Sequence, residues 1–193
     1  MRERLKKIFE LIDHENNQDP NTEVFQGVEY KKEYLYGLRM TEQLNAFNPI
    51  TTEVVKIACR AQHIRRWDLK RSAYTDGRAG YLRWRKDQGQ HHALVTANLM
   101  EQAGYSIGEI DTTKKIIMKK NIKSNQDSQN LEDTACLVFL KYYFTEFITN
   151  HEGDKLKNII IKTWEKMSKE AQQFALKHPF PKDQLQIIQE ALE

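Results

Sequence analysis

Apolar residues recur every three or four positions along most of the chain, a spacing typical of amphipathic helices. Leu5, Ile8 and Ile12 follow this spacing and predict a first helix within residues 1–20. No segment alternates polar and apolar residues for long enough to predict a sheet. The pattern indicates an all-α fold of seven or eight helices, arranged as a single domain over residues 1–193.

Prolines, glycines and capping residues divide this pattern into helices. Pro49 ends the helix predicted for residues 28–47, and Thr51 or Thr52 is suited to cap the next one, which extends to Trp67. Residues 68–80 hold two glycines and a Thr-Asp-Gly turn, which predicts an ordered loop. The other expected elements are helices at 81–102, 107–120, 131–148, 154–177 and 182–193, with a polar loop at 121–129.

Positive charge is concentrated in one segment. Residues 60–86 contain seven of the ten arginines and two lysines against two aspartates, a net charge of 9 − 2 = +7. The whole chain has a net charge of only +3, so the remainder carries −4. Arginine binds phosphate and carboxylate in a bidentate manner and stacks on aromatic rings. The segment therefore predicts an anion site.

Several partners fit such a site. A phosphorylated small molecule or a nucleotide would use the guanidinium groups, and single-stranded RNA would use the same groups together with aromatic stacking platforms. Alternatively, the arginines form a solvated charged face, bind an acidic protein partner, or mediate homo-oligomerisation through opposite charges. The candidate phosphate ligands are Arg60, Arg65, Arg66, Arg71, Arg78, Arg85 and Lys119, and the candidate stacking residues are Trp67, Tyr74 and Trp84.

Ionisable residues within apolar helical pattern are candidates for catalysis, because burying them costs free energy unless they are paired. His63, His92 and Asp133 together offer a mixed N/O ligand set suited to a divalent metal such as Mn, Fe or Zn. Glu132 and His92 are then the candidate catalytic residues, with Glu132 as general base. Alternatively, the histidines are hydrogen-bonded core residues, and the two acids occupy a helix N-terminal turn. The sequence does not distinguish His91 from His92.

Other features restrict the class of protein. No run of about 18 apolar residues predicts a membrane span, and the N-terminus lacks the apolar core of a signal peptide. Cys59 and Cys136 are isolated and fit small core positions, so a reducing, cytoplasmic location is expected. No glycine-rich phosphate loop and no nucleophile elbow is present, which leaves side chains to bind any phosphate.

Several strings resemble a known family: YLYGLRM at 34–40, RAQHIRRW at 60–67, GYLRWR at 80–85, QNLEDTACLVFL at 129–140 and KTWEKMS at 162–168. They are similar to the family catalogued as domain of unknown function 4202, and the resemblance covers residues 28–176. The family implies no established activity. A weaker resemblance links the chain to the helical HD phosphohydrolases, which surround a metal with histidines and a late aspartate, but no adjacent His-Asp pair occurs here.

Together these features predict a metal-dependent, HD-like hydrolase that acts on a phosphorylated small molecule or nucleotide. The alternative is a helical module that binds RNA or another anion without catalysis. We expect no membrane partner.

Overall fold

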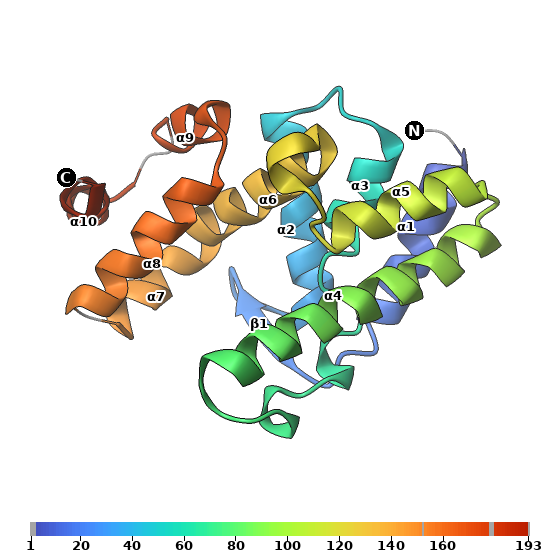
Figure 1. Ribbon diagram of the computed structural model, residues 1–193, viewed down its shortest axis with the longest axis horizontal. Helices are drawn as coiled ribbons and strands as arrows, with labels where there is room; N and C mark the ends of the chain where they lie inside the picture. The colour runs from blue at the N-terminus through green and yellow to red at the C-terminus, as the bar shows by residue number, and fades with distance from the viewer. Residues whose placement is uncertain (1–2, 152, 178–179, 193) are drawn as a thin grey trace. The chain divides into compact units, whose positions relative to one another are not determined.

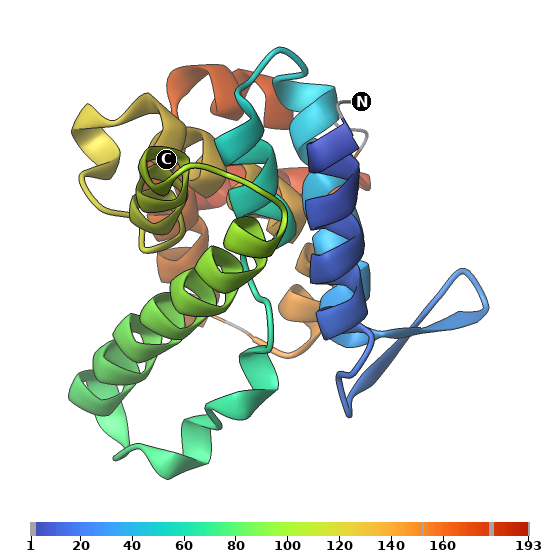
Figure 2. The ribbon, with the colours of Figure 1, turned by 90° about the vertical axis from the view of Figure 1, so that its right-hand side faces the viewer.

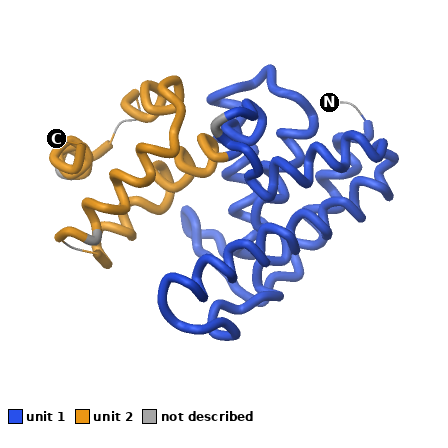
Figure 3. Tube along the Cα trace, in the orientation of Figure 1, with its two compact units in different colours: residues 1–131 blue, residues 132–193 orange. Residues whose placement is uncertain are grey.

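The computed structural model describes residues 3–151, 153–177 and 180–192, which form ten α-helices and one two-stranded sheet (Figure 1). The predominantly helical fold is confirmed, but the described residues contain more helices than the seven or eight predicted. The chain divides into two compact units, residues 1–131 and 132–193 (Figure 3). No described helix is long and apolar enough to cross a membrane.

The first unit packs its helices around a fully buried apolar core that includes Ile8, Met40, Ile57 and Ile116. The most extensive contacts join α4 to α5, α3 to α5 and α2 to α3 (Figures 1 and 2). Its elements are α1 (Glu3–Asn16), β1 (Thr22–Phe25), β2 (Val28–Lys31), α2 (Lys32–Phe47), α3 (Glu53–Arg60), the 3₁₀ turns η1 (Arg66–Asp68) and η2 (Arg71–Ala73), α4 (Gly77–Gln102), α5 (Ile107–Ile117), η3 (Ile122–Ser124) and the start of α6 (Gln126–Val138).

Strands β1 and β2 form an antiparallel hairpin that the sequence analysis did not predict. Thr22 pairs with Lys31 and Phe25 with Val28, and Figure 2 shows the hairpin projecting from the helices. Its two-residue turn, Gln26–Gly27, has φ values of 50° and 79°, as a tight hairpin turn requires. Strands of four residues with no fully buried position are too short to show a period-two pattern, so the helix predicted from residue 28 begins at Lys32.

Helix α3 ends at Arg60, whereas the apolar pattern predicted a helix to Trp67. A Cβ atom on Gly37 of α2 would lie 2.9 Å from the Arg60 carbonyl oxygen, so the two helices approach closely where α3 ends. The chain then turns, and Arg65 adopts the left-handed conformation with φ of 51°. His63 therefore lies in a turn and not on a helix face.

Helix α4 starts at Gly77, four residues before the predicted Tyr81. A Cβ atom on Gly80 would lie 1.9 Å from the Thr75 carbonyl oxygen, so only glycine lets the preceding segment fold against the first turn. The predicted loop at 68–80 is ordered, but 3₁₀ turns and this helical turn occupy much of it.

The second unit continues from α6 through the π-helical turn η4 (Phe139–Tyr143), α7 (Phe144–Thr149), α8 (Gly153–Lys166), α9 (Lys169–Ala175) and α10 (Lys182–Leu192). The single helix predicted for 154–177 is two helices, because the Ser168 side chain accepts from the Ala171 N–H and caps α9. The loop predicted at 121–129 is shorter than expected, since α6 begins at Gln126.

Candidate functional site: a basic pocket with two neutral histidines

Three side chains spaced four residues apart on α4 hold the segment that follows α3. Trp84 Nε1 donates to the Leu69 carbonyl (2.8 Å), Gln88 Nε2 to the carbonyls of Arg66 (2.8 Å) and Leu69 (3.0 Å), and His92 Nδ1 to that of Ile64 (2.6 Å). Residues at i, i+4 and i+8 share a helix face. This face of α4 therefore fixes residues 64–69 beside a pocket.

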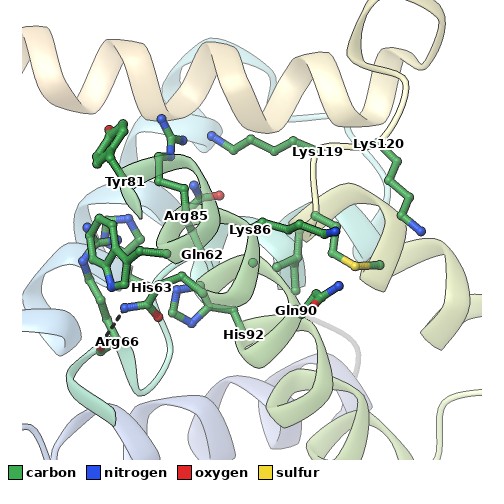
Figure 4. Close-up of a pocket in the computed structure, with 15 residues that line it drawn as sticks. Gln62, His63, Arg66, Tyr81, Arg85, Lys86, Gln90, His92, Lys119 and Lys120 are labelled. Atoms are coloured by element: carbon green, nitrogen blue, oxygen red, sulfur yellow. Dashed lines mark hydrogen bonds between the residues drawn. The ribbon is translucent and has the colours of Figure 1, made fainter. Parts of the chain in front are cut away.

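The pocket has a volume of about 490 Å³ (Figure 4), within the range of small-molecule sites. It is lined by α4, by the turn after α3 and by the end of α5. The lining residues are Gln62, His63, Arg66, Tyr81, Trp84, Arg85, Lys86, Gln88, Gly89, Gln90, His92, Ile117, Met118, Lys119 and Lys120.

Five of these residues are cationic, and no aspartate or glutamate is among the described residues that line the pocket. Figure 4 shows the charged ends of Arg85 and Lys119 pointing toward one another. Arg66 stacks on the Trp84 ring with its guanidinium carbon 4.9 Å from the ring centroid. The lining is therefore strongly positive, and nearby basic side chains repel further positive charge.

Lys119 occupies a backbone position that usually favours glycine. Its φ of 53° places it in the left-handed region directly after α5. The Lys119 N–H donates to the Ile116 carbonyl and the Lys120 N–H to the Lys115 carbonyl, which is the Schellman pattern that closes a helix. A lysine at this position retains backbone strain, and strain of this kind often accompanies function.

One ring nitrogen of His92 makes no hydrogen bond within the described residues. A carbonyl oxygen only accepts, so the bond to Ile64 fixes the proton on Nδ1 and leaves a lone pair on Nε2. That Nε2 atom is buried and has no hydrogen-bond partner. Burial holds the pKa of His92 well below its ordinary value, and electrostatic repulsion from His63 and Arg66 lowers it further. His92 is therefore a neutral hydrogen-bond acceptor.

Two glutamines add further acceptors. The Oε1 atoms of Gln62 and Gln88 are both buried without a hydrogen-bond partner. Because Gln88 donates through Nε2 to two carbonyls, the orientation of its amide is fixed. Three residues of the pocket lining thus each have a buried acceptor atom without a hydrogen-bond partner among the described residues.

His63 is paired with a buried carboxyl group. Its Nδ1 lies 3.2 Å from Glu33 Oε2, and Tyr36 stacks on the imidazole with ring centroids 3.9 Å apart. Burial raises the pKa of Glu33 to about 7, although nearby Arg66 opposes this shift. Burial, aided by the positive charges of Arg66 and Lys119, lowers the pKa of His63 well below its ordinary value. The pair therefore gains or loses a proton close to neutral pH.

The structure brings some of the predicted site residues together in this pocket. They are His63, Arg66, Trp84, Arg85, His92 and Lys119. His91 lies outside the lining, where its Nε2 is 3.1 Å from Asp68 Oδ2.

The other predicted phosphate ligands lie outside the pocket lining. Arg60 is buried and donates to both carboxylate oxygens of Asp13, at 2.7 and 2.6 Å. Arg65 pairs with Asp68 at 3.0 Å. Arg71 donates to the Tyr74 carbonyl, and Arg78 is exposed. Of the predicted stacking residues, Tyr74 donates its hydroxyl to Asp87, and Trp67 is half-buried.

Glu132 and Asp133 belong to the second unit and lie in the middle of α6, not in its first turn. The Asp133 carboxylate accepts from the backbone N–H and the hydroxyl of Ser168, at 2.7 and 2.6 Å. Glu132 Oε1 lies 3.9 Å from Lys166 Nζ. Asp133 thus anchors the N-terminus of α9.

Within the described residues, no group of three His, Cys, Asp or Glu side chains is arranged to hold a metal ion. The pocket offers two imidazoles, whose centroids are 6.1 Å apart, amid five cations. This donor set does not fit a divalent cation, and the predicted metal site finds no support.

Sequence reasoning missed Glu33, Gln62, Lys86 and Gln88. The spacing of Trp84, Gln88 and His92 was a readable signal, because it places three hydrogen-bonding side chains on one face of a predicted helix. Glu33 gave no such signal, since only the tertiary fold brings it to His63.

Comparison with known proteins places this chain in a family. The sequence profile of the family described as domain of unknown function (DUF4202) matches residues 6–188, so the chain belongs to that family. No curated protein and no solved structure is significantly similar to it. The HD-like arrangement therefore remains a prediction.

Proposed function

We propose that the first unit binds a phosphorylated small molecule in the basic pocket and acts on it by proton transfer through the Glu33–His63 pair. One observation carries the proposal: five cations line a pocket with no acidic residue among its described lining. Charge-assisted hydrogen bonds from such side chains to phosphate are typically worth about 1.5–3 kcal/mol each.

The Glu33–His63 pair supplies a group that either accepts or donates a proton. When Glu33 is ionised, His63 Nδ1–H donates to it, and Nε2 is left as an acceptor for a ligand proton. When Glu33 is protonated, its hydroxyl donates to Nδ1, and the neutral ring carries its proton on Nε2. General acid–base catalysis of this kind contributes roughly 10²–10⁴-fold to a rate. Hydrolysis or transfer of a phosphate ester needs both roles.

The proposal departs from a metal-dependent mechanism, because the described lining of the pocket includes none of the carboxylates that a divalent cation favours. Its charge balance comes instead from Arg66, Arg85, Lys86 and Lys119. We therefore derive no step through a metal.

Calorimetric titration with inorganic phosphate at low salt tests the binding step. Wild-type protein should bind, and Arg85→Met and Lys119→Met should each weaken binding at least tenfold. Arg83→Met on α4 and Lys115→Met in the last turn of α5 make the same chemical changes outside the pocket, so they should bind as wild type does. Equal affinity in all four variants would refute the proposal.

RNA binding is the second candidate, favoured by exposed Arg78, Arg83 and Tyr81 along α4. Salt distinguishes the two. A protein that neutralises 6–10 phosphates loses about 10³–10⁵ in affinity between 50 and 200 mM salt, whereas a pocket for one phosphate group should lose far less. Single-stranded RNA that binds with a steep salt dependence and competes with phosphate would favour the RNA function.

A further inference from the structure

Arg66 lies between the pocket and the Glu33–His63 pair. Its Nε atom is 4.0 Å from Glu33 Oε1, and Glu33 Oε2 is in turn 3.2 Å from His63 Nδ1. The Arg66 guanidinium group also stacks on the Trp84 ring, and both residues line the pocket. The Arg66 side chain is 33% exposed, whereas that of Glu33 is only 8% exposed. A ligand in the pocket can therefore reach Arg66 but not Glu33.

The guanidinium group of Arg66 carries one positive charge, for which Glu33 and a bound anion compete. Burial raises the pKa of Glu33 to about 7, and the charge of Arg66 opposes this effect by favouring the carboxylate. An anion bound to Arg66 would offset that charge and repel the carboxylate. Because Glu33 is buried, little solvent screens this repulsion. Protonation of Glu33 removes it.

The other charged groups around the pair have smaller effects on Glu33. After burial, Arg66 has the largest effect on the pKa of Glu33. Asp19, whose carboxylate accepts from the Glu33 N–H at 3.0 Å, raises this pKa, and Lys32 lowers it. The charged and titratable groups that face His63 are Arg66, Lys119, Arg85, Lys32 and His92. A change in the charge balance at Arg66 should therefore alter the protonation of the pair near neutral pH.

Resting on the proposed function, we infer that Arg66 is a positioning residue that couples the ligand to the Glu33–His63 pair, so that the pair takes up a proton from solution when an anion binds to Arg66. The proton converts the pair to its acid form, in which the Glu33 hydroxyl donates to His63 Nδ1 and the ring carries its proton on Nε2. Ligand binding thus prepares the acid that the proposed proton transfer requires. Because linkage is reciprocal, a lower pH must tighten the binding of the anion.

Calorimetry with sulfate at low salt tests the inference on the wild-type protein. Sulfate stays a dianion between pH 6.5 and 9, whereas phosphate groups themselves titrate near neutral pH. If the bound anion raises the pKa of the pair from about 7 to about 8, titrations at pH 8 in two buffers of different ionisation enthalpy should show an uptake of about 0.4 proton per sulfate bound. The affinity for sulfate should then fall about five- to tenfold between pH 6.5 and 9.

Two variants test the roles of Glu33 and Arg66, and thermal unfolding checks that each variant is folded. The glutamine in Glu33→Gln cannot ionise, so at pH 9 this variant should bind sulfate about five- to tenfold more tightly than wild type and take up no proton. Glu29→Gln makes the same change at an exposed position and should behave as wild type does. Arg66→Met should weaken sulfate binding at least tenfold at pH 6.5 and raise the midpoint of its pH dependence, because Glu33 loses the charge that favours its carboxylate. Arg83→Met, outside the pocket lining, should change neither.

Each contrary result has a distinct meaning. Sulfate that binds without proton uptake would overturn the inference while leaving the anion site intact. A wild-type pH dependence in Glu33→Gln would overturn the assignment of the proton to the pair. Unchanged affinity and midpoint in Arg66→Met would overturn the role of Arg66. Failure of both sulfate and inorganic phosphate to bind at pH 6.5 would instead overturn the proposed function.

Discussion

Arg60 and Arg85 come from the same basic segment, but the fold uses them differently. Arg60 is 6% exposed, forms a bidentate ion pair with Asp13 and lies over the Phe9 ring. Arg85 lines a pocket that no described acidic residue lines, and its guanidinium carbon is 5.9 Å from the Tyr81 ring centroid. The first arginine joins α3 to α1, whereas the second is positioned for a ligand.

The difference shows that arginine density alone does not locate an anion site. What distinguishes the two regions is whether the fold supplies a carboxylate. Near Arg60 it does, and the charge is balanced within the protein. Around Arg85 and Lys86 the described lining of the pocket contains no carboxylate, so an external anion can provide the balance.

The largest expected effect is on stability at Arg60. Arg60→Met leaves Asp13 without its ion-pair partner beside a packed helix junction, and it should lower the free energy of unfolding by about 3 kcal/mol. Arg85→Met should change stability by less than about 0.5 kcal/mol. Urea unfolding of both variants measures the contrast. Similar stability losses would mean that the two arginines are not structurally different.

A second contrast is between wild type and Glu33→Gln in how stability depends on pH. The pKa of Glu33 in the folded protein is about 7, above its ordinary 4.5, so the folded state holds this proton more tightly. The stability that this contributes is complete below about pH 4.5 and is lost as the pH rises through 7. The glutamine in Glu33→Gln stays neutral at every pH. Between pH 5 and 8 the free energy of unfolding of this variant should therefore fall by about 1–3 kcal/mol less than that of wild type.

Unfolding curves at several pH values between 5 and 8 provide this comparison. The same variant should lose turnover of a phosphate ester, because a glutamine cannot exchange a proton with His63. Parallel stability profiles for variant and wild type would show that Glu33 is not a buried titrating group.

Asp133 should behave as a structural residue of the second unit. Asp133→Ala removes the acceptor for the Ser168 N–H and hydroxyl, which should cost about 1–3 kcal/mol. Phosphate affinity should be retained, since every residue that lines the pocket belongs to the first unit. Loss of phosphate binding in a folded variant would return Asp133 to the site, as the sequence analysis proposed.

The smallest effect concerns the strained lysine. Lys119→Gly relieves a left-handed conformation at the end of α5 and should raise stability by about 0.5–1 kcal/mol, yet weaken phosphate binding about tenfold. Lys119→Met should weaken binding similarly without the gain in stability. Thermal unfolding together with calorimetry separates the two effects, and a glycine variant that binds phosphate normally would remove Lys119 from the site.

The sequence predicted the helical class, the buried cysteines and the basic character of the site, because periodicity, isolation and charge are local properties. It placed His63 on a helix, since the apolar pattern continues past Arg60 while the backbone turns. It grouped Asp133 with the histidines because a buried carboxylate resembles a ligand in sequence. Only the fold shows that Ser168 binds Asp133 and that Glu33 reaches His63.

Nitrogen-15 NMR of the histidine side chains during titration with inorganic phosphate tests the central claim most directly. The imidazoles of His63 and His92 should be neutral at pH 7, with the His92 proton on Nδ1, and their nitrogen signals should shift together to saturation. His14, outside the pocket lining, should not respond. Unchanged His63 and His92 signals at saturating phosphate would contradict the assignment of this pocket as the anion site.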